Sequence, residues 1–141
     1  MRRVSIVIAV CFVLAIGISL VGQGRDLDAI MKEIGPTWMG PTGLQAAITS
    51  PMPDYTKIAA DAAKLQGLFT EAEGQFSKMK MTEAAGFAKA TADAAGALAK
   101  EAKTGKIADA AGTAKSIGQC KACHAKYREG DGAGGFKLKM N

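Results

Sequence analysis

The chain has few of the residue types on which most catalytic and metal sites depend. It contains one histidine and three cysteines among 141 residues, and only 6% of its residues are aromatic. No stretch shows the polar–apolar alternation of a β-strand. No basic cluster is interleaved with aromatic residues, so nucleic-acid binding is not supported. With so few cysteines, the chain is not a disulfide scaffold.

The histidine and two of the cysteines stand together as Cys120-Lys121-Ala122-Cys123-His124. This C-x-x-C-H pattern attaches a c-type haem, because two thiols add to the vinyl groups at one porphyrin edge and the adjacent imidazole binds the iron. Residues three and four positions apart share one face of a helix, so the spacing predicts a helix that carries all three side chains. Since no second histidine exists, we expect one covalent haem c, attached through Cys120 and Cys123 and ligated by His124.

Other interpretations of the two thiols have less support. A structural zinc site needs four ligands, and only Cys11, inside an apolar leader, could join these three residues. A thioredoxin-type dithiol belongs to a βαβ context, which is not expected in this chain. A disulfide between residues three positions apart would close too small a loop to stabilise the fold much.

Residues 1–24 are expected to direct the chain out of the cytoplasm. Arg2 and Arg3 precede an uncharged, strongly apolar run from Val4 to Val21, as in an export signal. Because c-type haem is attached outside the cytoplasm, we expect a periplasmic protein. The run is also close to the length that spans a bilayer, so an uncleaved membrane anchor is the alternative to a cleaved signal peptide.

The remaining chain is expected to form one all-α domain over residues 25–130 and a flexible, glycine-containing tail over 131–141. Apolar residues recur at helical spacing in four main segments. The first begins near Arg25 and is interrupted at Gly35-Pro36, the second runs from Asp54 to between Gly74 and Lys80, the third from Thr82 to Thr104, and the fourth from Ile107 to Glu129. A short helix is expected at 42–49. Such segments, joined by short turns, predict an antiparallel four-helix bundle.

A C-x-x-C-H motif at the end of the last helix, instead of near the N-terminus, resembles cytochrome c-prime and its low-spin relatives. The resemblance covers most of residues 25–130. It is carried by Cys120, Cys123, His124, the following Ala125-Lys126-Tyr127-Arg128, and the string Met31-Lys32-Glu33-Ile34-Gly35. In the gas-binding members, a bulky apolar residue of the first helix faces the haem. In the low-spin members this residue is a methionine followed by a lysine, similar to Met31-Lys32. The resemblance also implies that Arg128 pairs with a haem propionate, and that the chain can form a homodimer through its first two helices.

The sixth iron ligand distinguishes the possible functions. Met31 and Met39 are the plausible methionine ligands, and only Met31 lies in phase with the apolar residues of the first helix. By periodicity alone, Met31 is either an ordinary core methionine or a ligand, and the family string favours ligation. A His/Met iron suits electron transfer, so we predict a cytochrome that passes single electrons between redox partner proteins. The alternative is a five-coordinate haem protein that binds NO or CO. An enzyme such as a peroxidase is not expected, because no distal histidine or arginine is available to act on bound peroxide. Membrane contact is expected only if the leader is uncleaved.

Overall fold

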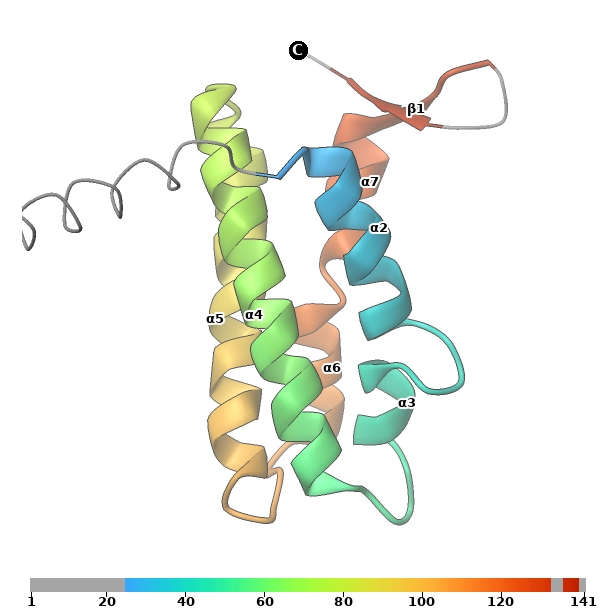
Figure 1. Cartoon of the computed structure of the whole chain (residues 1–141), viewed down its shortest axis with the longest axis vertical. Coiled ribbons are helices and arrows are strands. Elements are labelled where there is room, and N and C mark those ends of the chain that lie inside the picture. Colours follow the sequence, from blue (N-terminus) through green and yellow to red (C-terminus); the bar gives the residue numbers. More distant parts are fainter. Residues whose placement is uncertain (1–24, 133–135, 140–141) are drawn as a thin grey trace, which may run out of the picture.

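Two long antiparallel helices, α4 (Tyr55–Lys78) and α5 (Thr82–Ala102), lie next to each other along one side of the molecule (Figure 1). The structure is a computed structural model and describes residues 25–132 and 136–139. These two helices share the most extensive interface in the described chain. The buried residues of α4 include large side chains, such as Leu65 and Phe69, whereas those of α5 are mainly alanines. The small side chains of α5 therefore allow a close approach of its neighbours.

The helices α2 (Leu27–Trp38) and α3 (Leu44–Ile48) follow one another along α4. Pro36 lies inside α2, although the sequence indicated an interruption at Gly35-Pro36. Proline lacks the N–H that would complete the helical ladder, yet the helix continues for two further residues. It ends where the Met39 N–H donates to the Gly35 carbonyl (2.8 Å). The expected short helix at 42–49 is confirmed as α3.

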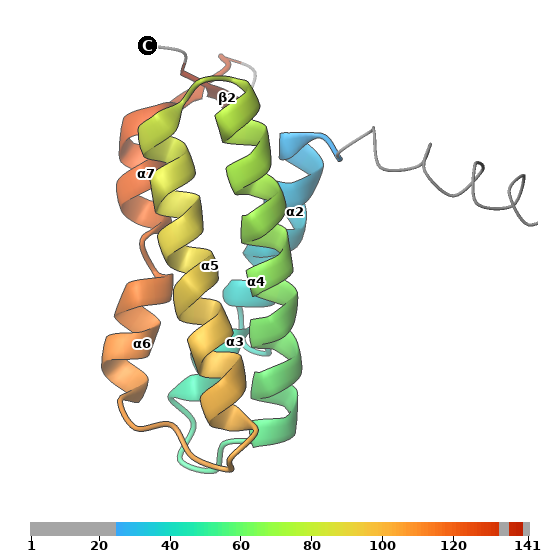
Figure 2. The same cartoon turned by 90° about the vertical axis from the view of Figure 1, so that its left-hand side faces the viewer.

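The last predicted helix is in fact two helices, α6 (Ala110–Ile117) and α7 (Cys120–Tyr127). Gly118 caps α6, and its N–H donates to the Ala114 carbonyl (2.9 Å). The indole of Trp38 lies beside this break. A Cβ atom at Gly118 would be in van der Waals contact with the Trp38 Cζ2 atom, at 3.9 Å. Both helices pack against α5. Figure 2 shows them at one edge of the α4–α5 pair, with α2 at the other.

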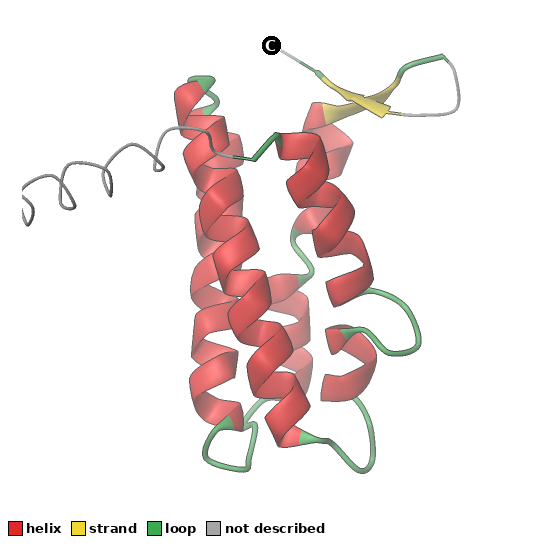
Figure 3. Cartoon of the chain, viewed as in Figure 1, coloured by secondary structure: helices red, strands yellow, loops and turns green. Residues whose placement is uncertain are grey.

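A short antiparallel hairpin follows α7 and was not expected from the sequence. Its strands are β1 (Arg128–Gly130) and β2 (Phe136–Leu138), with Arg128 opposite Leu138 (Figure 3). The Lys139 N–H donates to the Tyr127 carbonyl (2.8 Å), which joins the hairpin to the end of α7. Strands of three residues are too short to show a clear alternation. All other regular elements of the described chain are helices, which confirms the prediction of a mainly α-helical fold.

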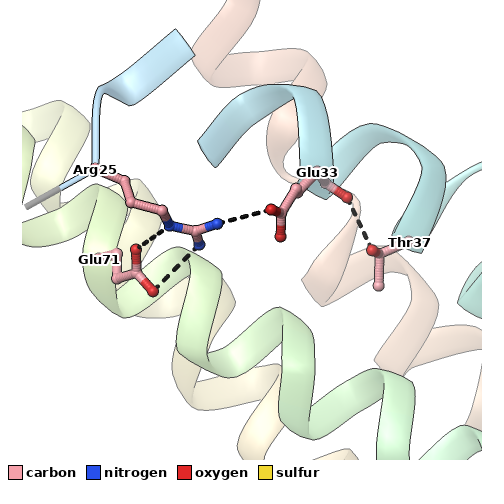
Figure 4. A network of polar contacts seen from close by, with 4 residues as sticks. All are labelled: Arg25, Glu33, Thr37 and Glu71. Carbon is pink, nitrogen blue, oxygen red and sulfur yellow. Dashed lines mark hydrogen bonds and ion pairs between the residues drawn. The ribbon is translucent and has the colours of Figure 1, made fainter. Parts of the chain in front are cut away.

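The start of the described chain is tied to α4 by a polar network (Figure 4). The Arg25 guanidinium donates to both carboxylate oxygens of Glu71 (2.9 and 3.3 Å) and to Glu33 (2.7 Å). Gln75 donates from Nε2 to the Arg25 carbonyl (3.0 Å), and the Thr37 hydroxyl donates to the Glu33 carbonyl (2.8 Å). The fork-shaped contact with Glu71 has the geometry that arginine favours. It joins the beginning of α2 to α4.

No helix within residues 25–132 and 136–139 is both long enough and apolar enough to cross a membrane. The apolar run that was expected to be a signal peptide or anchor belongs to residues 1–24, which lie outside the described residues.

Candidate functional site

The motif Cys120–His124 forms the first part of α7, as its spacing predicted. Both cysteines are free thiols, partly buried, and they pack against the hydrophobic core. The Cys120 Sγ atom donates to the Ile117 carbonyl at 3.8 Å. His124 is more exposed than the thiols. The helix therefore directs its two thiols inward and leaves the imidazole accessible.

The surroundings of the motif keep its three side chains neutral at neutral pH. Desolvation raises the pKa of both thiols. The pKa of Cys123 is raised further by repulsion between the two sulfurs in their thiolate forms and by the Glu83 carboxylate. Partial desolvation lowers the pKa of His124, and the positive charge of Arg128 lowers it further. A neutral imidazole has a nitrogen lone pair available for a metal.

Arg128 follows α7 directly. It is the C-cap residue of the helix, and its N–H donates to the His124 carbonyl. Its guanidinium is close enough to depress the pKa of the imidazole. The pairing of Arg128 with a haem propionate, which the family resemblance implied, stays a prediction.

Met31 is half-buried on α2 and packs against the core. α2 and α7 lie at the same end of the molecule in both views (Figures 1 and 2). α2 packs on α4, α7 packs on α5, and the two helices make at most a minor direct contact with each other. Met31 and His124 therefore belong to elements at one end of the molecule that do not pack tightly together.

Glu83 was not identified from the sequence, yet it contacts the end of α7. Its Oε2 atom accepts a hydrogen bond from the Tyr127 hydroxyl (2.9 Å) and forms an ion pair with Lys126. The hydrogen bonds from Lys126 and Tyr127 hold the pKa of Glu83 below its usual value. The Lys126 ammonium also lies 5.5 Å from the centre of the Tyr127 ring. No local pattern connects residue 83 with residues 126 and 127, so this contact had no signal in the sequence.

In the part of the chain that the structure describes, no three His, Cys, Asp or Glu side chains gather to hold a metal ion by themselves. The zinc interpretation therefore has no complete ligand set among these residues. Two open depressions of the surface lie away from the motif. One lies between the start of α4 and the end of α5, around Tyr55 and Ala102, and the other lies between α5 and α6, around Ala97 and Gly112.

No family model, curated protein or solved structure matches this chain. The chemistry of the site therefore has to follow from its own residues.

Proposed function

We propose that the chain is a periplasmic c-type cytochrome that carries single electrons through one haem. Cys120 and Cys123 would hold the haem c covalently, and His124 and Met31 would ligate its iron. The observation that carries the proposal is the C-x-x-C-H motif on one turn of α7, with both thiols packed against the core. The redox partners would be other proteins.

We interpret the helices as an antiparallel four-helix bundle. α4 and α5 would be two of its members, α2 with α3 the third, and α6 with α7 the fourth. In this interpretation the haem lies at the end of the bundle that carries α2 and α7, which make at most a minor contact with each other. The alanines of α5 support this, because small side chains leave room for a large planar group beside them.

The residues of the motif suit a haem. Cys120 and Cys123, both free and packed against the core, would hold the haem through thioether links, and the neutral His124 ring would supply a ligand for its iron. Met31 is a half-buried thioether on a separate element and would supply a second ligand for the iron. When bound, the haem supplies an iron that takes up and releases one electron.

A His/Met ligand pair fits an electron carrier. The soft thioether of Met31 favours the ferrous state and raises the potential. If both side chains stay bound in both redox states, little of the protein has to rearrange during transfer. The positive charge of Arg128 beside His124 would offset a propionate.

The proposal is tested on the full chain purified from a host that matures c-type cytochromes. We expect a mass increase of one haem that persists after denaturation, and a low-spin absorption spectrum in the ferrous state. The Met31→Ala variant is expected to become high-spin and five-coordinate, and its reduction potential should fall.

Met39→Ala is the matched control, because Met39 is 58% exposed and follows α2 in a loop. It should leave the spectrum unchanged. A wild-type chain without covalent haem would reject the cytochrome. A high-spin ferrous spectrum that Met31→Ala does not alter, with CO binding that displaces no ligand, would favour the NO/CO-binding alternative.

A further inference from the structure

The helix that carries the motif is held to the rest of the described chain by few side chains. Of the eight residues of α7, only Tyr127 is buried. The main contacts of α7 with other elements are with α5 and with the hairpin strand β1. The orientation of α7 therefore depends strongly on how Tyr127 is held.

The face of α7 that carries the thiols also carries Tyr127. Tyr127 follows Cys123 by four positions and His124 by three, so these side chains lie along one side of the helix. A rotation of α7 about its axis would move all of them together. Any contact that fixes the Tyr127 side chain therefore also fixes the directions of the thiols and the imidazole.

Glu83 supplies that contact from the first turn of α5. Its carboxylate accepts a part-buried hydrogen bond from the Tyr127 hydroxyl (2.9 Å) and forms an ion pair with the ammonium of the neighbouring Lys126. Loss of the acceptor of a part-buried hydrogen bond is costly, whereas an exposed ion pair contributes little. The Glu83 and Lys126 side chains are about half exposed (53% and 47%). The hydrogen bond from Tyr127 therefore constrains the orientation of α7 more than the ion pair with Lys126 does.

We infer that Glu83 is a positioning residue for the haem-attachment helix: through the Tyr127 hydroxyl it sets the rotation of α7 and thereby the direction of the His124 imidazole. Glu83 itself touches neither the iron ligand nor the reacting atoms. The role in haem orientation rests on the proposed function, whereas the anchoring of α7 can be measured separately.

The test compares the wild-type holoprotein with Glu83→Ala, Glu83→Gln and Tyr127→Phe. Proton NMR of the ferric protein reads the direction of the axial imidazole from the spread of the haem methyl resonances. We expect that spread to change in Glu83→Ala and in Tyr127→Phe. Glu83→Gln keeps an oxygen acceptor for Tyr127 and should restore most of the wild-type pattern. Amide exchange of residues 120–127 should be about tenfold faster in Glu83→Ala and in Tyr127→Phe than in the wild type.

Asp93→Ala is the matched control. It also removes one acidic residue from α5, but Asp93 pairs with Lys89 on the same helix. It should leave the methyl pattern and the exchange of α7 unchanged. Wild-type methyl resonances and exchange rates in Glu83→Ala would overturn the inference, as would equal changes in Asp93→Ala. A wild-type chain without haem would instead reject the proposed function, and the exchange of α7 would still decide whether Glu83 anchors this helix.

Discussion

The motif residues differ in their exposure but share a neutral state. Burial raises the pKa of the Cys120 and Cys123 thiols, and partial desolvation lowers the pKa of the His124 imidazole. Charged forms of these groups would be costly beside an apolar ring system, because a buried charge needs a partner. The helix therefore presents two neutral thiols and an imidazole with a free nitrogen lone pair.

Glu83 makes the stability of the protein depend on pH. Its folded-state pKa lies below the usual value, since Lys126 and Tyr127 stabilise the carboxylate. Its contribution is therefore fully present above about pH 4.3, the usual pKa of a glutamate, and is lost as the pH falls through the lower folded-state pKa. We expect the free energy of unfolding to decrease less on acidification in Glu83→Gln than in the wild type. Urea unfolding at a series of pH values measures this difference, and equal slopes in both proteins would contradict it.

Among the elements, α2 with α3 and α6 with α7 are interrupted, whereas α4 and α5 are continuous. The motif lies on one of the shorter pieces, so α7 can take an orientation that differs from that of α6. The break at Gly118 lies beside Trp38 of α2. Trp38 of α2 therefore lies next to the break between α6 and α7, just before the helix that carries the motif.

The turn between α4 and α5 contains a strained lysine. Lys80 has φ = 58°, in the left-handed region that favours glycine. The chain reverses there, with the Met81 N–H donating to the Phe76 carbonyl (2.9 Å), an arrangement typical of helix C-termini. We expect Lys80→Gly to raise the free energy of unfolding by about 0.5–1 kcal/mol, because strain is relieved and part of the gain is offset by the freer unfolded chain.

Lys80→Ala controls for the loss of the charge, since it keeps a Cβ atom in the left-handed conformation. Its free energy of unfolding should not exceed that of the wild type. Urea denaturation of the three proteins decides the question. An equal gain in both variants would assign the effect to the lysine charge instead of the backbone.

At the scale of the whole molecule, packing is uneven. The α4–α5 pair shares the largest interface, whereas α2 and α7 depend on α4 and α5 respectively and make at most a minor contact with each other. A haem bound at their end of the molecule would join the two sides. The end that carries the motif is therefore expected to depend most on the cofactor.

Replacement of both motif cysteines, Cys120→Ser with Cys123→Ser, would remove the proposed covalent attachment of the haem and tests this dependence. In hydrogen exchange we expect α2 and α7 to lose protection, while the central parts of α4 and α5 keep it, because their interface does not involve the motif. Lys121→Ala is the control, since it changes an exposed residue of α7 and leaves the motif intact. Loss of protection throughout α4 and α5, or wild-type protection in α2 and α7, would contradict the expectation.

The helical segments followed from the sequence where local interactions decide them. The predicted start near Asp54 is confirmed, because the Asp54 side chain accepts from the Lys57 N–H (3.0 Å) and caps α4. The third segment was predicted to begin at Thr82, and Thr82 is the first residue of α5, after the N-cap Met81. The helical position of the C-x-x-C-H motif also followed from spacing alone. The haem, its ligation by Met31 and the export of the chain stay predictions.

The sequence by itself determined the helical character of the chain and the helical position of the motif, because residue spacing, helix caps and turns act between near neighbours. Only the tertiary structure decided that α6 ends beside Trp38 and that the Lys139 N–H joins the hairpin to the Tyr127 carbonyl. It also decided that Glu83 accepts the hydrogen bond of the Tyr127 hydroxyl. Each of these features joins residues far apart in the chain. Their contacts depend on how whole helices pack, and no local pattern encodes that packing.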